Sequence, residues 1–121
     1  MIKKRSQQTK EVRKNMRGGL GEVVIRHYFK KEEIDAPCRL CSELLLAPGT
    51  GIGEHEHINE DEIFIIQQGK ALIVDGGKEF EVEAGDAILT GKGSSHSIKN
   101  IGDTDLLVTA IIIQYSLRNG Y

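Results

Sequence analysis

The residues with the clearest chemical potential lie in the stretch GIGEHEHINEDE, residues 51–62. It holds two histidines, one asparagine, one aspartate and four glutamates, and it leads directly into IFIIQQG, a run typical of a buried strand. Side chains alternate between the two faces of an extended chain. If residues 53–57 are extended, His55 and His57 therefore lie on the same face. Two imidazoles then converge, as they do in metal sites.

Glu62 opens the strand that follows, and alternation places it on the same face as Phe64 and Ile66. Burying an ionised carboxylate costs several kcal/mol unless it is paired or coordinates a metal. No Lys or Arg lies in this stretch to pair with it. Two neutral imidazoles and one carboxylate suit first-row divalent metals and leave positions for water or substrate. The alternative is that the histidines are polar loop residues and Glu62 a solvated strand edge, and these residues alone leave both interpretations open.

The elements that would position these residues are short strands. Runs rich in β-branched and aliphatic residues, such as EVVIRHYF, CSELLLA, ALIVDG and LLVTAIIIQY, alternate with turns that contain most of the 14 glycines. DGGK is a candidate tight hairpin, and KKEEIDA could form one short turn of helix. Many strands at spacings near ten residues predict an all-β sandwich or barrel.

A chain of 121 residues is expected to form one domain. Residues 1–17 carry seven Lys or Arg against one Glu and few apolar side chains, which predicts a basic, mobile N-terminal arm. An anion-binding or subunit-clasping arm is the alternative. Residues 18–121 are expected to form the single barrel domain.

The overall charge and the apolar runs exclude several classes of partner. The formal net charge is -2, which gives no general attraction to nucleic acid or to membranes. The longest apolar run, LLVTAIII at 106–113, is strand-sized and shorter than a membrane helix. The N-terminal MIKKRSQQTK lacks the apolar stretch of a secretory signal. We therefore expect a cytoplasmic protein without a nucleic-acid or membrane partner.

Cys38 and Cys41 form the pair CRLC. Such a pair can be redox-active or supply half of a zinc site, but structural zinc needs four ligands and no second C-x-x-C occurs. The sequence favours two reduced thiols at the entry to a strand, with a zinc site shared across a dimer as the alternative.

Two spaced motifs extend the pattern beyond the histidine pair. The first comprises Gly49, His55, His57, Glu62 and Gly69, with five, one, four and six residues between successive members. The second, in GDAILTGKGSSHSIKN, comprises Gly85, Gly91, Lys92, Gly93, His96 and Asn100. Together, and in this order, they resemble the two signature motifs of the cupin superfamily. Gly91 stands where the family usually has proline.

The resemblance implies a jelly-roll cupin barrel with a metal inside it near one open end. It implies that His55, His57, Glu62 and His96 bind one divalent transition metal per chain. Nitrogen and carboxylate donors suit manganese, iron, cobalt, nickel or zinc and disfavour calcium. Small cupins similar to this chain are commonly dimers, so a homodimer is also expected.

The function has to be inferred from the site, because this fold hosts many chemistries. The first hypothesis is a metal-dependent enzyme acting on a small carboxylic acid, keto acid or sugar derivative by oxygenation, decarboxylation, isomerisation or lyase chemistry. The alternative is a non-catalytic module that binds a small molecule or sugar. The sequence identifies no catalytic residue beyond the ligands. His27 lies outside both motifs and is expected to be a hydrogen-bonded or half-exposed strand residue, with a place in the pocket as the alternative.

Overall fold

Ten strands make up most of the regular structure in the computed structural model, which describes residues 1–115. In chain order the strands are β1 (Lys10–Lys14), β2 (Glu22–Phe29), β3 (Cys38–Leu46), β4 (Gly51–Glu56), β5 (Glu60–Gln68), β6 (Lys70–Asp75), β7 (Lys78–Glu83), β8 (Ala87–Thr90), β9 (Ser95–Asn100) and β10 (Leu106–Gln114). Three single turns of 3-10 helix join them: η1 (Arg5–Gln7), η2 (Met16–Gly18) and η3 (Lys31–Glu33). No helix in the described part of the chain is long and apolar enough to cross a membrane.

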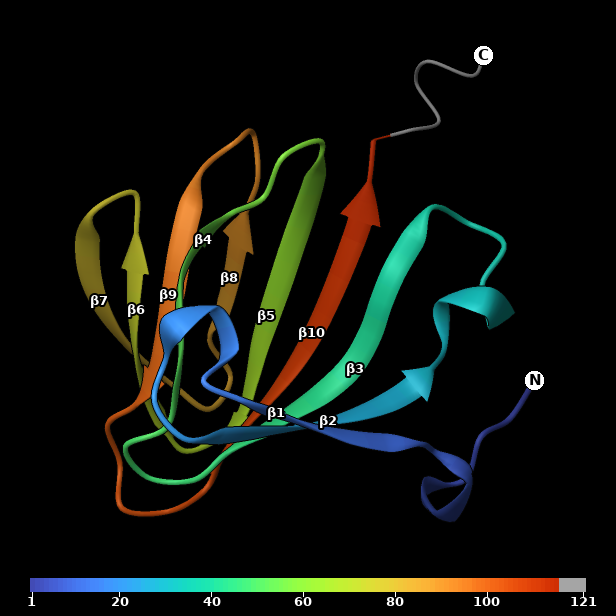
Figure 1. Ribbon diagram of the computed structural model, residues 1–121, viewed down its shortest axis with the longest axis horizontal. Coiled ribbons are helices and arrows are strands. Elements are labelled where there is room, and N and C mark those ends of the chain that lie inside the picture. Colours follow the sequence, from blue (N-terminus) through green and yellow to red (C-terminus); the bar gives the residue numbers. More distant parts are fainter. Residues whose placement is uncertain (116–121) are drawn as a thin grey trace.

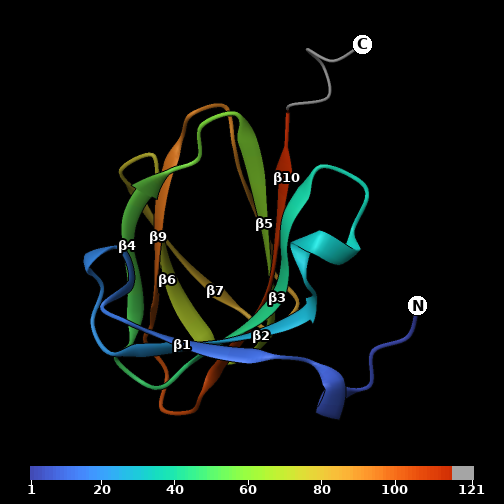
Figure 2. The ribbon, with the colours of Figure 1, turned by 45° about the vertical axis from the view of Figure 1, so that its right-hand side comes forward.

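The strands form two facing antiparallel sheets (Figure 1). One has six strands in the order β1-β2-β3-β10-β5-β8, and the other has four in the order β4-β9-β6-β7. From β3 to β6 each successive strand lies in the opposite sheet, and β8, β9 and β10 alternate in the same way. This crossing is the jelly-roll arrangement. Figure 2 shows β4 and β9 on one side, β10 and β3 on the other, and β1 and β2 crossing beneath them. The prediction of an all-β jelly-roll barrel is confirmed.

The core lies between the sheets and follows from alternation along each strand. In β5, Glu62, Phe64 and Ile66 are buried, whereas the residues between them are only partly buried. β10 shows the same alternation, with Val108, Ala110 and two further apolar residues facing inward. The inward placement of Glu62 with Phe64 and Ile66 is thus as the sequence predicted.

Part of the segment expected to be a mobile arm has regular structure. Lys10–Lys14 form β1, which pairs along its whole length with β2 at the edge of the larger sheet. Ahead of it, Lys3 forms a salt bridge of 2.7 Å to Glu33, and Arg5 one of 3.0 Å to Glu43. An edge strand is held by backbone hydrogen bonds and can expose charged side chains, so low apolar content does not prevent pairing.

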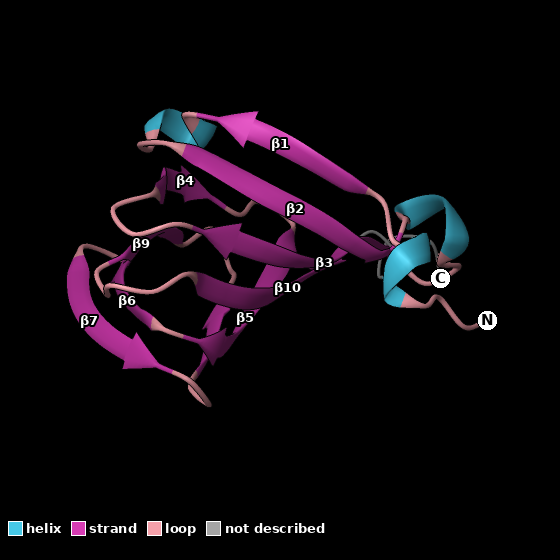
Figure 3. Cartoon of the chain, turned by 90° about the horizontal axis from the view of Figure 1, so that it is seen from below, coloured by secondary structure: helices cyan, strands magenta, loops and turns pink. Residues whose placement is uncertain are grey.

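The turn that joins β1 to β2 packs closely against β4, as Figure 3 shows at the helical turn beside that strand. A Cβ on Gly53 would collide with the carbonyl oxygen of Arg17, and a Cβ on Gly19 would collide with that of Gly51. Glycine at these positions lets two backbones approach, and this approach brings residues 16 and 17 to the mouth of the barrel near His55.

The hairpin predicted at DGGK joins β6 to β7. Gly76 and Gly77 have φ values of 57° and 84°, which are characteristic of a type I′ turn and are favoured by glycine. The short helical turn predicted in KKEEIDA is η3.

Candidate functional site

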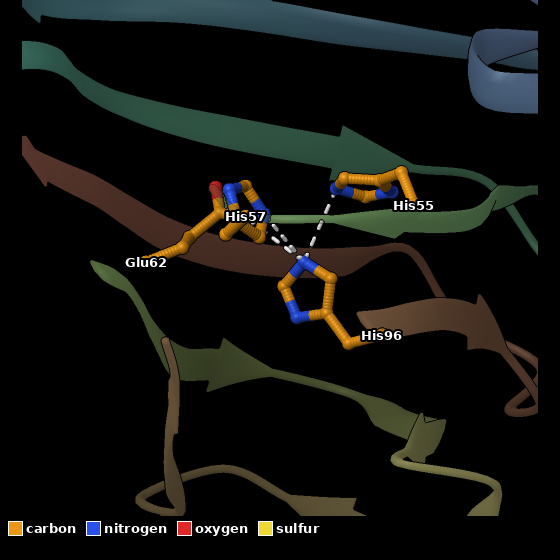
Figure 4. A group of neighbouring side chains, drawn as sticks. All are labelled: His55, His57, Glu62 and His96. Atoms are coloured by element: carbon orange, nitrogen blue, oxygen red, sulfur yellow. Dashed lines mark hydrogen bonds and ion pairs between the residues drawn. The ribbon is translucent and has the colours of Figure 1, made fainter. Parts of the chain in front are cut away.

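Three side chains from residues 55–62 meet a fourth, His96, which is distant in sequence, between the two sheets of the barrel (Figure 4). His55 lies on β4, His57 directly after it, Glu62 on β5 and His96 on β9. One potential ligand atom from each lies within 4.8 Å of all the others, and only His55 is not fully buried. The structure therefore brings together all four residues that the motifs predicted.

Strand pairing explains why they meet. His55 and His96 are Cα partners in adjacent antiparallel strands, so their side chains share the inner face of the smaller sheet. Glu62 reaches them from the inner face of the larger sheet. The ring of Phe64 stacks on His96 with the centroids 5.0 Å apart and an angle of 8° between the planes, which fixes the orientation of that imidazole.

Several of the potential ligand atoms lie about 3 Å apart. His96 Nε2 lies 2.9 Å from His57 Nε2 and 3.2 Å from His55 Nε2. Oε1 of Glu62 lies 2.8 Å from His57 Nε2 and 2.9 Å from His96 Nε2. Adjacent ligands at right angles on one ion, with bonds of about 2.1 Å, would be about 3.0 Å apart. The spacing therefore fits a shared metal ion.

The hydrogen bonds on the far side of two rings determine what faces the centre. His55 Nδ1 lies 2.8 Å from the carbonyl oxygen of Gly53, and His57 Nδ1 lies 2.6 Å from Glu60 Oε2. Both oxygens only accept, so each Nδ1 is the donor. In the neutral imidazoles, Nε2 then carries a lone pair directed at the other ligand atoms. Both lone pairs face His96 Nε2, and their repulsion is relieved either by a metal ion at the centre or by a hydrogen carried on His96 Nε2.

The pKa values of these groups are determined by burial and by the hydrogen bonds and charges that oppose it. Burial lowers the pKa of His55. Burial also acts to lower the pKa of His57, but hydrogen bonds to Glu62 and Glu60 outweigh it and raise that pKa. For Glu62, burial acts to raise the pKa, yet the two histidines lower it to about 2. The carboxylate is therefore ionised at neutral pH, and without a metal the preferred proton site is the His57 imidazole.

Glu60 contacts the group of four from behind His57, Arg39 contacts Glu60, and the sequence pattern did not assign either residue to the site. Arg39 donates two hydrogen bonds to Glu60, of 2.7 and 2.8 Å, and Glu60 in turn accepts from His57. Burial acts to raise the pKa of Glu60, but Arg39 and His57 lower it. A carboxylate behind a ligand histidine orients the ring and increases its basicity. Alternation could have indicated Glu60, because it lies two residues before Glu62 on the same face of β5.

A cavity of about 80 Å³ adjoins the four residues and is lined by His55, His57 and Glu62 together with apolar side chains. Its other polar walls are three arginines, Arg13, Arg17 and Arg39. Within residues 1–115, Glu62 is the one carboxylate in its lining. The cavity can therefore admit only a small ligand, and its charged walls favour an anion. A larger hollow of about 720 Å³ lies elsewhere, between Lys70, Glu83 and Asp103, and contains none of the four residues.

Three other residues singled out from the sequence lie outside the group. His27 is hydrogen-bonded through Nδ1 to Ser42 at 2.7 Å and through Nε2 to Glu11 at 2.9 Å, as expected for a strand histidine. Cys38 and Cys41 are free cysteines. Burial raises the pKa of the Cys41 thiol. Neither thiol is close enough to belong to the cluster of four.

Gly91, where the family motif has proline, occupies a crowded position. A Cβ there would collide with the carboxylate of Asp61 and lie 3.0 Å from the hydroxyl of Tyr115. Tyr115 donates a hydrogen bond to that carboxylate, and the Lys92 backbone N–H donates one of 3.3 Å to the Tyr115 hydroxyl. These contacts hold the turn that precedes His96, so side-chain packing supplies the restraint that proline would give.

The fold and the site together define the class of protein. Residues 42–112, more than half of the chain, match the family model for the cupin domain. The chain belongs to the cupin family, as the two motifs indicated.

A curated protein and a crystal structure, both from Thermotoga maritima, resemble the chain over nearly its whole length. It is 42% identical over 113 residues to a protein named oxalate-binding protein, a match that covers 93% of each. A crystal structure of a predicted oxalate decarboxylase from the same organism shares 42% identity and a TM-score of 0.90, covering 94% of this chain and 99% of that one.

A more distant structure shares the fold. The polyketide cyclase RemF of Streptomyces resistomycificus has a TM-score of 0.75 at 18% identity, covering 95% of this chain and 80% of that one. At this identity the likeness concerns the fold alone, and the function has to be inferred from the site.

Proposed function

We propose that this protein is a metal-dependent cupin that binds a small dicarboxylate such as oxalate. His55, His57, Glu62 and His96 hold one divalent transition metal per chain, either manganese, iron, cobalt, nickel or zinc. The cavity beside them receives the carboxylate ligand. When bound, the metal supplies a Lewis acid that can coordinate and polarise a carboxylate oxygen.

The observation that carries the metal assignment is the meeting of four ligand atoms within 4.8 Å of one another, with four of the pairs among three Nε2 atoms and one carboxylate oxygen at 2.8 to 3.2 Å. In addition, Nδ1 of His96 is buried and has no hydrogen-bond partner within residues 1–115, so the polar contacts of this ring are all on the Nε2 side. One ion would satisfy every inward-facing atom, whereas a single proton would satisfy only one pair.

Three observations support a small dicarboxylate as the ligand. The cavity of about 80 Å³ excludes large molecules, and arginines from β1, its following turn and β3 line it. Of these, Arg17 forms none of the salt bridges found in the described part of the chain, so its charge is available to a ligand. The relative with 42% identity is named for oxalate.

Turnover is the second candidate function, because the similar crystal structure is that of a predicted oxalate decarboxylase. Among the reactions considered from the sequence, decarboxylation of a dicarboxylate is the one that this relative favours. The product would keep one carboxylate and would need one proton. Binding without turnover is proposed first, since Glu62, the one carboxylic acid that the described residues contribute to the cavity lining, is assigned to the metal.

The test uses the metal-free chain reloaded with cobalt(II), whose visible spectrum reports coordination, and with manganese(II). We expect one metal per chain, and oxalate binding by calorimetry that requires the metal and exceeds the binding of acetate. Metal uptake without oxalate binding would contradict the ligand assignment. Formate release from oxalate by the manganese protein would establish the decarboxylase function in place of simple binding.

Glu60→Gln is expected to weaken metal binding by about 10- to 100-fold, the usual effect of losing the partner behind a ligand histidine. The amide keeps the shape of the side chain but removes its negative charge. That charge accepts the hydrogen bond from His57 Nδ1 and pairs with Arg39. Metal titration of the purified protein measures the effect. Glu54→Gln, an exposed change on β4, is the matched control and should bind metal like the parent. Equal affinities of the two variants would show that Glu60 does not support the site.

Metal affinity should fall as pH decreases, because protons compete for the imidazole nitrogens. The pKa of His57 is raised, so protonation of the metal-free site begins at a higher pH than for an ordinary histidine, whereas His55, with a lowered pKa, competes only in more acidic solution. Glu62, with a pKa of about 2, stays ionised throughout this range. Below the pKa of His57 we expect a loss of about tenfold per pH unit for each proton displaced. Cobalt titrations from about pH 8 to about pH 5 test this, and a constant affinity would contradict it.

The outer face of the larger sheet supports the proposal of a homodimer. Leu89, Ile63 and Ile111 are Cα partners on adjacent strands and therefore form one apolar row across β8, β5 and β10. Leu89 is 66% exposed in the single chain. Covering this row with a second copy would remove it from water. Light scattering at micromolar concentration should give twice the chain mass, and a monomer would contradict the proposal. The cytoplasmic location stays a prediction.

A further inference from the structure

A second cavity, of about 460 Å³, lies outside the metal cavity, and we call it the vestibule. Its walls come from β1, the end of β2, η3 with the residue before it, and the start of β3. Five basic side chains line it, against two acidic ones, Glu11 and Glu32. The basic residues are Lys10, Arg13, Lys30, Lys31 and Arg39. In a chain whose net charge is -2, this concentration of positive charge is a local feature.

The vestibule adjoins the metal cavity. Arg13, Arg39 and Leu40 line both cavities, so these three side chains form the boundary between them. Figure 3 shows β1 and β2 extending past the strands of the smaller sheet toward the short helical turns near the N-terminus. A ligand that enters the vestibule meets the two arginines before it reaches the four ligand residues.

Part of the vestibule's charge is not neutralised by the protein. Arg39 is paired with Glu60, and Arg13 lies 3.5 Å from Glu11. By contrast, Lys10, Lys30 and Lys31 take part in none of the salt bridges found within residues 1–115. These lysines are exposed at the rim. Like charges gathered around a concave, low-dielectric surface produce a field that attracts ions of opposite charge.

We propose that the vestibule is an electrostatic entrance that draws small dianions into the metal cavity. The inference rests on the proposed function, and it adds that the rim lysines act on the rate of association and do not hold the bound ligand. Exposed charges at the edge of a site mainly change the association rate and its salt dependence, whereas buried contacts determine dissociation. Lys30 and Lys31 are therefore expected to affect entry, and the metal with its surrounding side chains is expected to affect retention.

The test compares association rates of oxalate with the cobalt-loaded protein, followed by stopped-flow absorbance. In the double variant Lys30→Glu and Lys31→Glu the association rate constant should fall by roughly tenfold at low ionic strength. The dissociation rate constant should be unchanged. The difference should disappear in about 1 M salt, where the screening length is about 3 Å. The control is Lys78→Glu with Lys99→Glu, which makes the same charge change at exposed positions on the smaller sheet.

Equal association rates and equal salt dependence in the vestibule variant and the control would overturn the inference while leaving the proposed function intact. If instead oxalate causes no spectral change in the cobalt protein, the proposed ligand is wrong. The same rates measured with azide, a small anion that coordinates cobalt, then decide the role of the vestibule separately. Slower azide entry in the vestibule variant alone would support an entrance for anions in general.

Discussion

Replacing His57 or His96 with alanine is expected to reduce metal affinity by more than about 100-fold, because removing a direct ligand costs more than removing a partner behind one. Through Nε2, His57 contacts two other members of the group and His96 contacts all three, and both histidines are almost completely buried. Elemental analysis after dialysis against a defined concentration of free metal measures the loss.

The fold should persist in these variants. The apolar core, which includes Val23, Leu46 and Ile73, packs without any contribution from a metal, unlike the interior of a zinc finger. His96→Gln fills more of the vacated volume and separates the loss of a ligand from the opening of a cavity. His27→Ala, at the histidine outside the group, is the control and should keep its metal. Full metal content in folded His57→Ala and His96→Ala would disprove the assignment.

Phe64→Ala should lower the free energy of unfolding by about 3–5 kcal/mol, the usual cost of removing a buried phenylalanine. The side chain is only 1% exposed, and its ring packs in the core and stacks on His96. The loss combines the transfer of the ring from water with the cavity that remains. Denaturant unfolding of the metal-free protein measures it.

Leu20→Ala is the matched control, because Leu20 is 68% exposed and lies outside the apolar row of the proposed dimer interface. Its unfolding free energy should change by no more than about 0.5 kcal/mol. Phe64→Ala should also weaken metal binding, since His96 loses the surface that orients it. If both variants unfold at the same denaturant concentration, Phe64 does not have the central role that its burial indicates.

Local patterns in the sequence predicted most of the strands, and the resemblance to the cupin motifs predicted the four candidate ligands. EVVIRHYF corresponds to β2 at both ends, and alternation correctly placed Glu62 on the inner face with Phe64. These predictions succeed because alternation and turn chemistry act over a few residues. Motif spacing identified His96 as well, although only the pairing of β4 with β9 brings it beside His55.

The N-terminal strand β1 could not be predicted from local sequence patterns. The charged residues of β1 have no apolar alternation, and the strand exists because β2 offers backbone hydrogen-bonding groups at the edge of a sheet that forms elsewhere in the chain. Its position then brings Arg13 and the following turn to the metal cavity. Side chains expected to belong to a mobile arm therefore form part of the site's wall.

The contacts that orient the site residues likewise depend on the tertiary structure. Arg39 and Glu60 are 21 residues apart in sequence, and they meet because their strands lie on either side of β10 in one sheet. Gly91 takes the place of the family's proline, and its turn is held by Asp61 and Tyr115, which come from two other strands or their ends. The residue types and their spacing thus determined which groups could coordinate a metal, because strand alternation is a local property. Their orientation, their protonation and the arginine-lined approach to them depend on contacts between distant strands, which only the assembled barrel establishes.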